Sequence, residues 1–334
     1  MTSTPLPLAD AELADLLAGR LDLVEERLRD AVAHADVLAD ATSRHLVNAG
    51  GKRLRPLLTL LAAQLGEGHR PEVVDAAVVV ELTHLATLYH DDVMDSAPVR
   101  RGAPSAHEVW GNQVAILTGD LLFARASGIV AGLGPEAVRI QAATFERLCL
   151  GQLHETVGPP PGADPVAHYL QVLSDKTASL IATSARFGAM FAGCRPAVVD
   201  TLIVYGEKVG VAFQLADDVI DLTSDGDQTG KTPGTDLREK VPTMPALLLR
   251  ERARGPQGTA ADRELVALLD SDLASDEALA EAVAGLRAHP VVADTRDRAV
   301  AWAHEAVAAL GTLPPGAVKD SLVSFAEALV DRAS

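Results

Sequence analysis

Apolar residues recur at the spacing of an α-helix along almost the whole chain. From about residue 11 to residue 47, leucine and valine stand at i, i+3 and i+4 intervals, until Gly50-Gly51 interrupts the pattern. No convincing pair of strands is found, so the pattern predicts an all-α fold. The same criteria predict further helices at about 55–65, 73–90, 107–131, 135–156, 165–173, 175–192, 196–222, 242–252, 260–270, 276–287, 290–311 and 315–332.

Short segments containing glycine and proline separate these helices. Because no low-complexity linker divides the chain, we predict one all-α domain over residues 1–334, with a frayed tail at residues 1–9, although length alone suggests about two domains. Residues 224–241 are polar and rich in glycine, which is typical of a mobile lid over a reactive site.

Composition narrows the possible partners and location. Hydrophobic residues make up 48% and aromatic residues only 3%, which favours close-packed helices. A net charge of −17 argues against nucleic acid or an anionic membrane surface as the main partner. The two cysteines, Cys149 and Cys194, are too few for a disulfide framework, and no basic signal region or membrane-spanning run is found. We therefore expect a cytoplasmic protein without a transmembrane segment.

Two copies of a D-D-x-x-D motif interrupt otherwise apolar helices. The first copy is Asp91, Asp92 and Asp95, and the second is Asp217, Asp218 and Asp221. On a helix the first and last aspartates of each copy share one face, and the middle one lies about 100° away. Like charges at this spacing repel one another, so each motif requires a cation.

An all-oxygen cluster without thiolates suits Mg²⁺, which prefers carboxylates together with substrate phosphates. Neither copy has a lysine or arginine within one turn upstream to neutralise it. The two acidic helices are therefore expected to face each other and hold a metal-bound diphosphate. A single triplet could be a solvated helix face, but two copies in apolar settings argue against that interpretation.

Basic residues accompany the motifs. Lys52 and Arg55 stand beside Gly50-Gly51, whose backbone amides could approach an anion, and Arg100-Arg101 follow the first acidic motif. Together these motifs resemble the trans-polyprenyl diphosphate synthases of the polyprenyl synthetase family, of the long-chain type, over about residues 45–245. That family condenses isopentenyl diphosphate with an allylic diphosphate.

The resemblance implies a homodimer of helical bundles, each surrounding a deep central cavity, with three Mg²⁺ ions bound at the two acidic motifs. The implied metal site comprises Asp91, Asp92, Asp95, Asp217, Asp218 and Asp221, with Asp92, Asp218 and Asp221 in supporting roles. The allylic diphosphate would be held by Arg100, Lys176 and Lys231. The isopentenyl diphosphate would be held by Lys52, Arg55, His84 and Arg101. Thr177 and Gln214, with Lys176, would steady the allylic cation.

Several of these residues also have a purely structural interpretation. His84 could be a satisfied core histidine, Lys52 and Arg55 could complement a helix terminus, and Lys176-Thr177 could mark a helix start. The chain also departs from the family pattern, because Val241 stands where the family usually has lysine. Lys240 could substitute for that lysine from one position earlier.

The resemblance to long-chain members implies a product for quinone side chains. Ala86 stands about 1.4 turns before Asp91, where short-chain relatives carry a bulky aromatic residue, so we expect an open path for about eight to ten isoprene units. A short- or medium-chain product is the alternative. The residues expected to affect length are Ala86, Thr87, Leu82 and Phe123.

Two other functions were compared with this prediction. A class I terpene cyclase would carry a different second motif and would need no second anion site, whereas this chain has a second D-D-x-x-D and the cations Lys52, Arg55 and Arg101. A non-catalytic synthase subunit would be expected to lack one acidic motif, and both copies are complete here.

Overall fold

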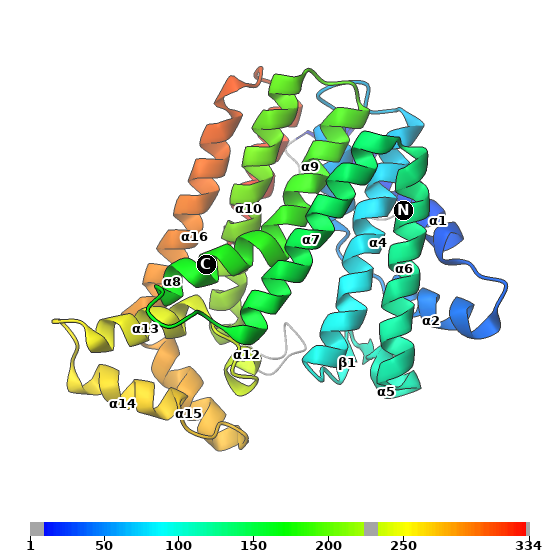
Figure 1. Cartoon of the computed structure of the whole chain (residues 1–334). Helices are drawn as coiled ribbons and strands as arrows, with labels where there is room; N and C mark the ends of the chain where they lie inside the picture. The colour runs from blue at the N-terminus through cyan, green and yellow to red at the C-terminus, as the bar shows by residue number, and fades with distance from the viewer. Residues whose placement is uncertain (1–9, 224–232, 332–334) are drawn as a thin grey trace. The chain divides into compact units, whose positions relative to one another are not determined.

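The computed structural model describes residues 10–223 and 233–331, and nearly all of its regular structure is helical (Figure 1). The predicted all-α fold class is confirmed. The helices are α1 (Ala11–Val32), α2 (Val37–Asn48), α3 (Leu54–Ala63), α4 (Pro71–Met94), α5 (Ala106–Trp110), α6 (Asn112–Gly132), α7 (Pro135–Val157), α8 (Pro165–Leu173), η1 (Ser174–Ala178), α9 (Ser179–Phe191), α10 (Pro196–Thr223), α12 (Thr235–Arg238), α13 (Met244–Arg254), α14 (Ala260–Leu269), α15 (Asp276–Arg287), α16 (Pro290–Ala309), η2 (Leu310–Thr312) and α17 (Ala317–Asp331).

The helix predicted over residues 11–47 is wrong in one respect, because the chain breaks between α1 and α2. Asp36 adopts an extended conformation there and its side chain accepts a hydrogen bond from the Ala39 amide, which caps the start of α2. A second predicted helix is split at Gly111, whose φ of 83° ends α5 before α6 begins.

A small hairpin follows the first acidic motif, where a loop was predicted. Strand β1 (Val99–Arg100) pairs antiparallel with β2 (Ala103–Pro104). The connecting residues Arg101 and Gly102 both have positive φ, 55° and 77°, as two-residue hairpin turns require. A strand pair this short leaves no alternating pattern for sequence analysis to detect.

The chain divides into two compact units. The first unit comprises Met1–Glu146, Ser179–Gly206 and Ala309–Phe325, and the second comprises Arg147–Ala178, Glu207–Ala308 and Ala326–Ser334. Helices α7 and α10 each contribute to both units. The single-domain organisation expected from the sequence stays a prediction.

In the first unit, α4 packs against α1, α3, α6 and α9 (Figure 1). Eight of the ten residues of α3 are buried, as its almost entirely apolar sequence requires. Gly188 of α9 lets the two backbones meet, because a Cβ there would lie 2.1 Å from the Thr59 carbonyl oxygen of α3. The end of α4 that carries the first acidic motif is therefore anchored in a rigid helical core.

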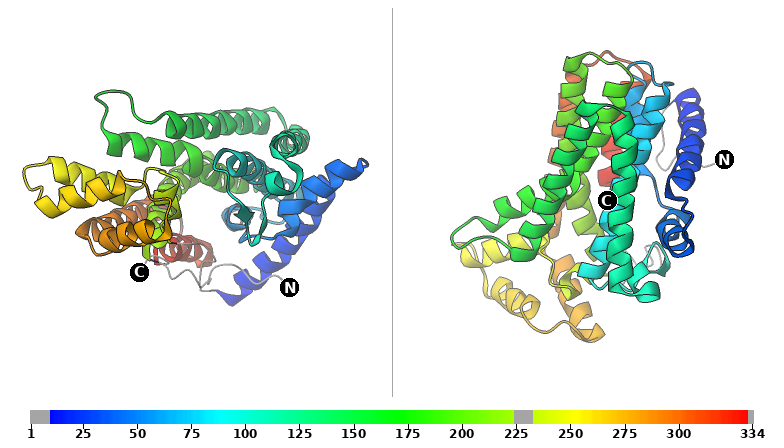
Figure 2. Two further views of the ribbon diagram at one scale, coloured as in Figure 1. Left: turned by 90° about the horizontal axis from the view of Figure 1, so that it is seen from below. Right: turned by 45° about the vertical axis from the view of Figure 1, so that its right-hand side comes forward.

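In the second unit, a core of buried leucine, valine and alanine side chains surrounds the later part of α10. Leu215, Val219 and Leu222 of α10 belong to this core together with Leu249 of α13 and Leu286 of α15. Helix α14 packs against α13 and α15, and these three helices can be followed from yellow to orange in Figure 2. This packing anchors the end of α10, where the second acidic motif lies.

Two described helices, α4 and α6, have the length and hydropathy of a membrane span. In α4 the most apolar window is 67% buried, which is typical of a core helix, whereas in α6 only 33% is buried. One or two such helices are weak evidence for a membrane span. The absence of a transmembrane segment stays a prediction.

Candidate active site

The first acidic motif lies at the end of α4, with Asp91 and Asp92 in the last turn and Asp95 as the C-cap residue. Asp92 is completely buried, and its Oδ1 accepts a hydrogen bond of 2.6 Å from the Arg100 Nε. Burial raises the pKa of Asp92, although Arg100 opposes the shift. Asp91 is half-buried and Asp95 is exposed. The middle aspartate therefore fixes Arg100, while the outer two lie on the accessible face of the helix.

The second acidic motif repeats this division of roles on α10. Asp218 is only 4% exposed and accepts hydrogen bonds from the Tyr169 hydroxyl, at 2.8 and 2.9 Å, and from the Met244 amide, at 2.9 Å. Burial is the main reason that the pKa of Asp218 lies well above its usual range. Asp217 and Asp221 are half-buried. Asp218 thus joins α8, α10 and the start of α13.

The outer aspartates fit Mg²⁺ by their chemistry. They are hard oxygen donors, and Mg²⁺ usually takes only one or two carboxylates in addition to waters and substrate phosphates. Within residues 10–223 and 233–331, no group of three or more histidine, cysteine, aspartate or glutamate side chains is arranged as a ready-made metal site. Phosphate oxygens of a substrate would therefore have to complete the coordination.

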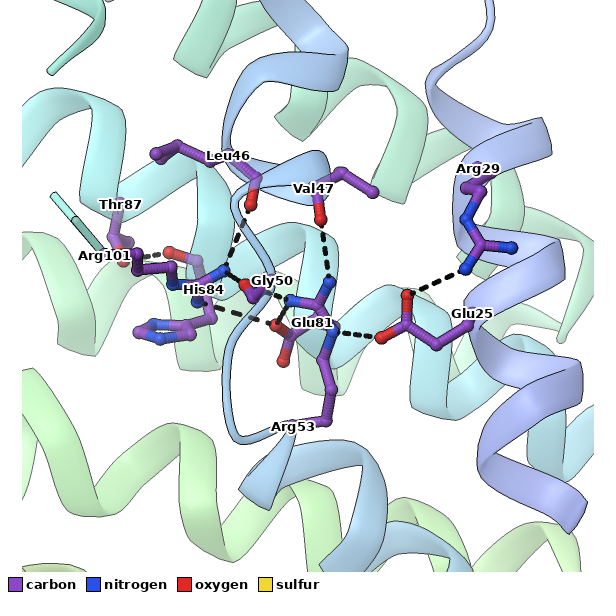
Figure 3. Close-up of polar contacts among 10 residues, drawn as sticks. All are labelled: Glu25, Arg29, Leu46, Val47, Gly50, Arg53, Glu81, His84, Thr87 and Arg101. Carbon is purple, nitrogen blue, oxygen red and sulfur yellow. Dashed lines mark hydrogen bonds and ion pairs between the residues drawn. The ribbon is translucent and has the colours of Figure 1, made fainter. Parts of the chain in front are cut away.

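A basic cluster lies where the start of α3 meets α4, and it comprises Arg53, Arg55 and Arg101 near the carboxylate of Glu81, with His84 beside them. Figure 3 shows Arg53, Arg101, Glu81 and His84. Three guanidinium groups surround a carboxylate that is only 2% exposed. The arrangement leaves an excess of positive charge, which favours binding of an anion.

Arg101 enters the basic cluster from the hairpin turn. Its Nη1 donates to the carbonyl oxygens of Leu46, at 3.2 Å, and Gly50. Its guanidinium lies against Gly51, where a Cβ would be 2.7 Å from the Arg101 Cζ and where φ is 138°. The glycine pair seen in the sequence is therefore needed to make room for this arginine.

Arg55 and His84 have the electrostatics expected of anion-binding groups. The Arg55 Nε is buried and has no hydrogen-bond partner within the described part of the chain. Burial, opposed by Glu81 and assisted by Arg101, lowers the pKa of Arg55 to about 10, so the side chain remains charged at neutral pH. Burial and the nearby Arg55 and Arg101 hold the pKa of His84 well below its usual range, so its ring is neutral. Lys52 is exposed beside this cluster.

Lys176 and Thr177 lie in η1, a π-helical turn between α8 and α9. Arg147 fixes this turn by donating to Asp175, at 2.8 Å, and to the Ser174 carbonyl oxygen, at 3.2 Å. Gly151 lets α7 approach, because a Cβ there would lie 2.5 Å from the Lys176 amide nitrogen. Single π-helical turns are frequent at functional sites.

The remaining predicted cations and polar residues lie as follows. The Lys176 Nζ forms an ion pair with Glu155. Thr177 is buried, and Gln214 is half-buried on α10. Lys231 and residues 224–232 of the predicted lid lie outside the described residues. Val241 is described, and its amide donates to the Asp236 carbonyl oxygen at 2.9 Å.

Of the residues expected to control product length, Ala86 and Leu82 are completely buried on α4. Thr87 is half-buried and its hydroxyl donates to the His84 carbonyl oxygen at 2.8 Å. The ring of Phe123 packs on Phe145, with centroids 3.9 Å apart, and lies 6.2 Å from the ring of His90. Phe123 therefore lies beside His90, the residue before Asp91. A residue that closes the deep end of the cavity would lie further from the acidic motif.

Several residues that hold these groups in place were not predicted from the sequence. Arg53, Glu25 and Glu81 are buried or half-buried in the first unit, and Arg147 and Glu155 contact η1 in the second. One signal was present, because Glu81 is a lone acid within a long apolar run. A carboxylate in such a position requires a buried cation as its partner.

Known proteins match this chain over most of its length. A family profile described as polyprenyl synthetase matches residues 36–286. Nonaprenyl diphosphate synthase from Mycobacterium tuberculosis is 45% identical over 326 residues, which cover 97% of this chain and 96% of that protein.

Solved structures are similar over almost their full length. A polyprenyl synthase from Caulobacter crescentus, complexed with calcium and isoprenyl diphosphate, aligns with a TM-score of 0.87 at 32% identity, covering 96% of this chain and 97% of that one. Geranylgeranyl pyrophosphate synthase from Corynebacterium glutamicum, also complexed with calcium and isoprenyl diphosphate, aligns with a TM-score of 0.85 at 41% identity, covering 98% and 99%. The chain therefore belongs to the polyprenyl synthetase family.

Proposed function

We propose that this protein is a Mg²⁺-dependent trans-prenyltransferase that condenses isopentenyl diphosphate with an allylic diphosphate. The observation that carries the proposal is the repeated division of roles within the two acidic motifs. In each, the middle aspartate is buried on protein partners while the outer aspartates stand on the accessible face. Solvated helix faces do not need this arrangement, whereas a metal–diphosphate site does.

The proposed reaction begins with the allylic diphosphate, which Arg100, Lys176 and Lys231 hold. Three Mg²⁺ ions bound through the outer aspartates would supply charge that stabilises the departing pyrophosphate. The bond between carbon 1 and oxygen breaks, and its electron pair leaves with the pyrophosphate. Thr177 and Gln214 would steady the allylic cation through their oxygen atoms.

Lys52, Arg55, His84 and Arg101 would orient isopentenyl diphosphate through its own diphosphate and without metal. The double bond of isopentenyl diphosphate then forms the new carbon–carbon bond to the allylic carbon. A proton leaves the adjacent carbon to the released pyrophosphate, and a double bond is restored. A neutral His84 suits the binding of isopentenyl diphosphate, because it can donate a hydrogen bond without adding a further charge.

We propose that the product is long, of the kind used for quinone side chains. The similarity to nonaprenyl diphosphate synthase, at 45% identity, supports this length. So does the small side chain of Ala86 on the buried face of α4, upstream of the acidic motif. A shorter product such as geranylgeranyl diphosphate is the second candidate, because the similar Corynebacterium glutamicum structure carries that name.

We also propose that the protein acts as a homodimer in the cytoplasm. Helix α6 supports the dimer, because its outward face exposes Leu117 by 65% and Ile116 by 42%, with the exposed acid Asp120 beside them. Small residues, Ala124 and Gly128, continue the same face. A second copy of the chain would bury these side chains.

The proposal is tested by replacing one outer aspartate in each motif. Asp91→Ala and Asp217→Ala should each lower kcat by at least about a hundredfold at low Mg²⁺, because a charge-stabilising group is lost. Asp75→Ala is the matched control, since it removes an acid from the same helix α4 at a surface ion pair with Arg27. Folded variants of both motifs that keep near-wild-type turnover would refute the assignment.

A further inference from the structure

We propose that Glu25, Arg53 and Glu81 form a brace by which helix α1 positions Arg55 and Arg101 for the diphosphate of isopentenyl diphosphate. The inference rests on the proposed function and assigns these three side chains the role of positioning residues. None of the three is needed to touch the substrate. The ion pairs of Arg53 with Glu25 and with Glu81 support this role.

The Arg53 guanidinium is engaged in contacts within the protein. Only 7% of its surface is exposed, and its Nε donates to Glu25 at 2.5 Å while its Nη1 donates to Glu81 at 2.7 Å (Figure 3). The remaining contacts are to the carbonyl oxygens of Val47 and Gly50, both at 3.2 Å. Four of the five N–H donors of a guanidinium are thus engaged, so Arg53 is not positioned to bind a ligand anion.

Arg53 also determines how closely the Glu81 carboxylate approaches Arg101. The Glu81 Oε1 lies 2.7 Å from the Arg53 Nη1 but 3.9 Å from the Arg101 Nη2. Without Arg53, the buried carboxylate would move onto Arg101 and Arg55 and cancel the charge that an incoming diphosphate needs. With Arg53 in place, Glu81 steers the Arg101 guanidinium while leaving most of its charge for the substrate.

The backbone at Arg53 is held in a sparsely populated conformation. Its φ of 47° and ψ of 37° are left-handed, and it is the N-cap residue of α3 with no side-chain capping bond. Such a conformation persists in a non-glycine residue only where the surroundings fix it. The two ion pairs provide that constraint, and they set the direction of the first turn of α3, where Arg55 stands two residues later.

Glu25 extends the brace to α1. It lies on the buried side of that helix, and a second arginine, Arg29, is 3.8 Å from its other oxygen. Burial lowers the pKa of Arg53, but the carboxylates of Glu81 and Glu25 more than offset this effect and raise it, so the Arg53 guanidinium remains charged in the folded protein. Loss of the Glu25 charge should therefore loosen Arg53 and, through Glu81, the arginines that bind the substrate.

The test compares Glu25→Gln with a control on the same two helices. Glu25→Gln should raise the KM for isopentenyl diphosphate about tenfold, because a charged hydrogen bond is lost, while kcat and the KM for the allylic substrate change less than about twofold. Asp75→Asn removes the Arg27–Asp75 ion pair, which also joins α1 to α4 but lies outside the basic cluster. It should leave all three constants unchanged.

Two further measurements separate the possible outcomes. Glu81→Gln should also raise the KM for isopentenyl diphosphate, whereas a carboxylate that merely neutralised the cluster would lower this KM when removed. Calorimetric titration with isopentenyl diphosphate in EDTA should show weaker binding to Glu25→Gln than to the wild type. This titration does not depend on turnover, so wild-type binding without condensation would refute the proposed function and leave the brace intact.

The brace itself would be overturned by either of two results in folded variants. One is a Glu25→Gln variant with unchanged KM and unchanged titration. The other is an equal rise of KM in Glu25→Gln and Asp75→Asn, which would show that the attachment of α1 in general matters and the brace does not. Thermal unfolding curves of all variants establish that they are folded at the assay temperature.

Discussion

At the scale of single residues, buried carboxylates fix the positions of the side chains that pair with them. Asp92, Asp218 and Glu81 are each at most 4% exposed, and each has a named partner: Arg100, Tyr169 and Arg53. A buried carboxylate is costly unless it is paired, so each of these acids fixes the group that pairs with it. Of these three partners, Arg100 is the one expected to touch the substrate, and a buried acid holds it in place.

Ala86 provides the residue-scale prediction for product length. Ala86→Tyr should shorten the product toward fifteen or twenty carbons, because a ring on this buried face of α4 would occupy volume that a growing tail needs. If Ala86 serves only close packing, tyrosine would instead cost about 1–3 kcal/mol of stability by overpacking. Chromatography of the products and the melting temperature are measured together.

Ala86→Ser is the matched control for this variant, because it changes the polarity with little change in volume. It should keep the wild-type product ladder. An unchanged ladder from folded Ala86→Tyr would remove the structural argument for product length.

The residues expected to contact substrate could be named from the sequence, whereas most of the residues that hold them in place could not. Arg55 was predicted because a cation beside Gly50-Gly51 suits an anion, whereas His84 was expected only from the family resemblance. The structure places both together with Arg101. Arg53 stands in the same basic run, but its left-handed backbone turns it toward Glu25 and Glu81. Helical spacing could not predict that direction, since Arg53 precedes the helix.

At the scale of secondary-structure elements, the ends of helices and the turns between elements determine where the functional groups lie. The first acidic motif lies at the end of α4, with Asp95 as the C-cap, although the predicted helix ended at residue 90. The second lies near the end of α10, within the helix predicted over residues 196–222. The π-helical turn η1 and the hairpin turn at Arg101 were not predicted, because each depends on tertiary contacts: Arg147 and Gly151 for the former, and Gly51 for the latter. Local sequence does not specify such contacts.

Helix α14 provides a pH-dependent prediction. Asp262 accepts a hydrogen bond from the Thr259 amide at 2.8 Å and lies 2.9 Å from the His289 Nε2, and these contacts hold the pKa of Asp262 well below its usual range. A lowered folded-state pKa stabilises the protein above the unfolded-state pKa of about 3.9, and this contribution is lost as pH falls through the folded-state value.

Asp262→Asn should therefore unfold at a lower urea concentration than the wild type at pH 7. The difference should shrink as the pH is lowered from about 4 to about 2, because in this range the wild-type carboxylate binds a proton in the unfolded state but not in the folded state. Asp270→Asn, which removes an exposed ion pair with Arg250, is the control for loss of charge on the same helix. A difference that persists unchanged at low pH would show that the charge of Asp262 is not the cause.

At the scale of the whole molecule, each unit carries part of the chemical inventory. The first unit contains Asp91, Asp95 and the basic cluster, and the second contains Asp217, Asp221 and the η1 turn with Lys176. Neither unit alone has every group that the proposed reaction needs. The fold class and both acidic motifs could be predicted from the sequence, because helical periodicity and motif spacing are local properties.

The central claim is tested most directly by the products formed from labelled isopentenyl diphosphate. The protein is incubated with Mg²⁺ and, in separate reactions, dimethylallyl, geranyl, farnesyl or geranylgeranyl diphosphate, and the products are separated by chain length. We expect label in all-trans products of a length near that of the nonaprenyl relative, and no incorporation when EDTA replaces Mg²⁺. Failure to incorporate label with any of the four allylic substrates, or conversion of an allylic substrate alone to a cyclic hydrocarbon, would contradict the account.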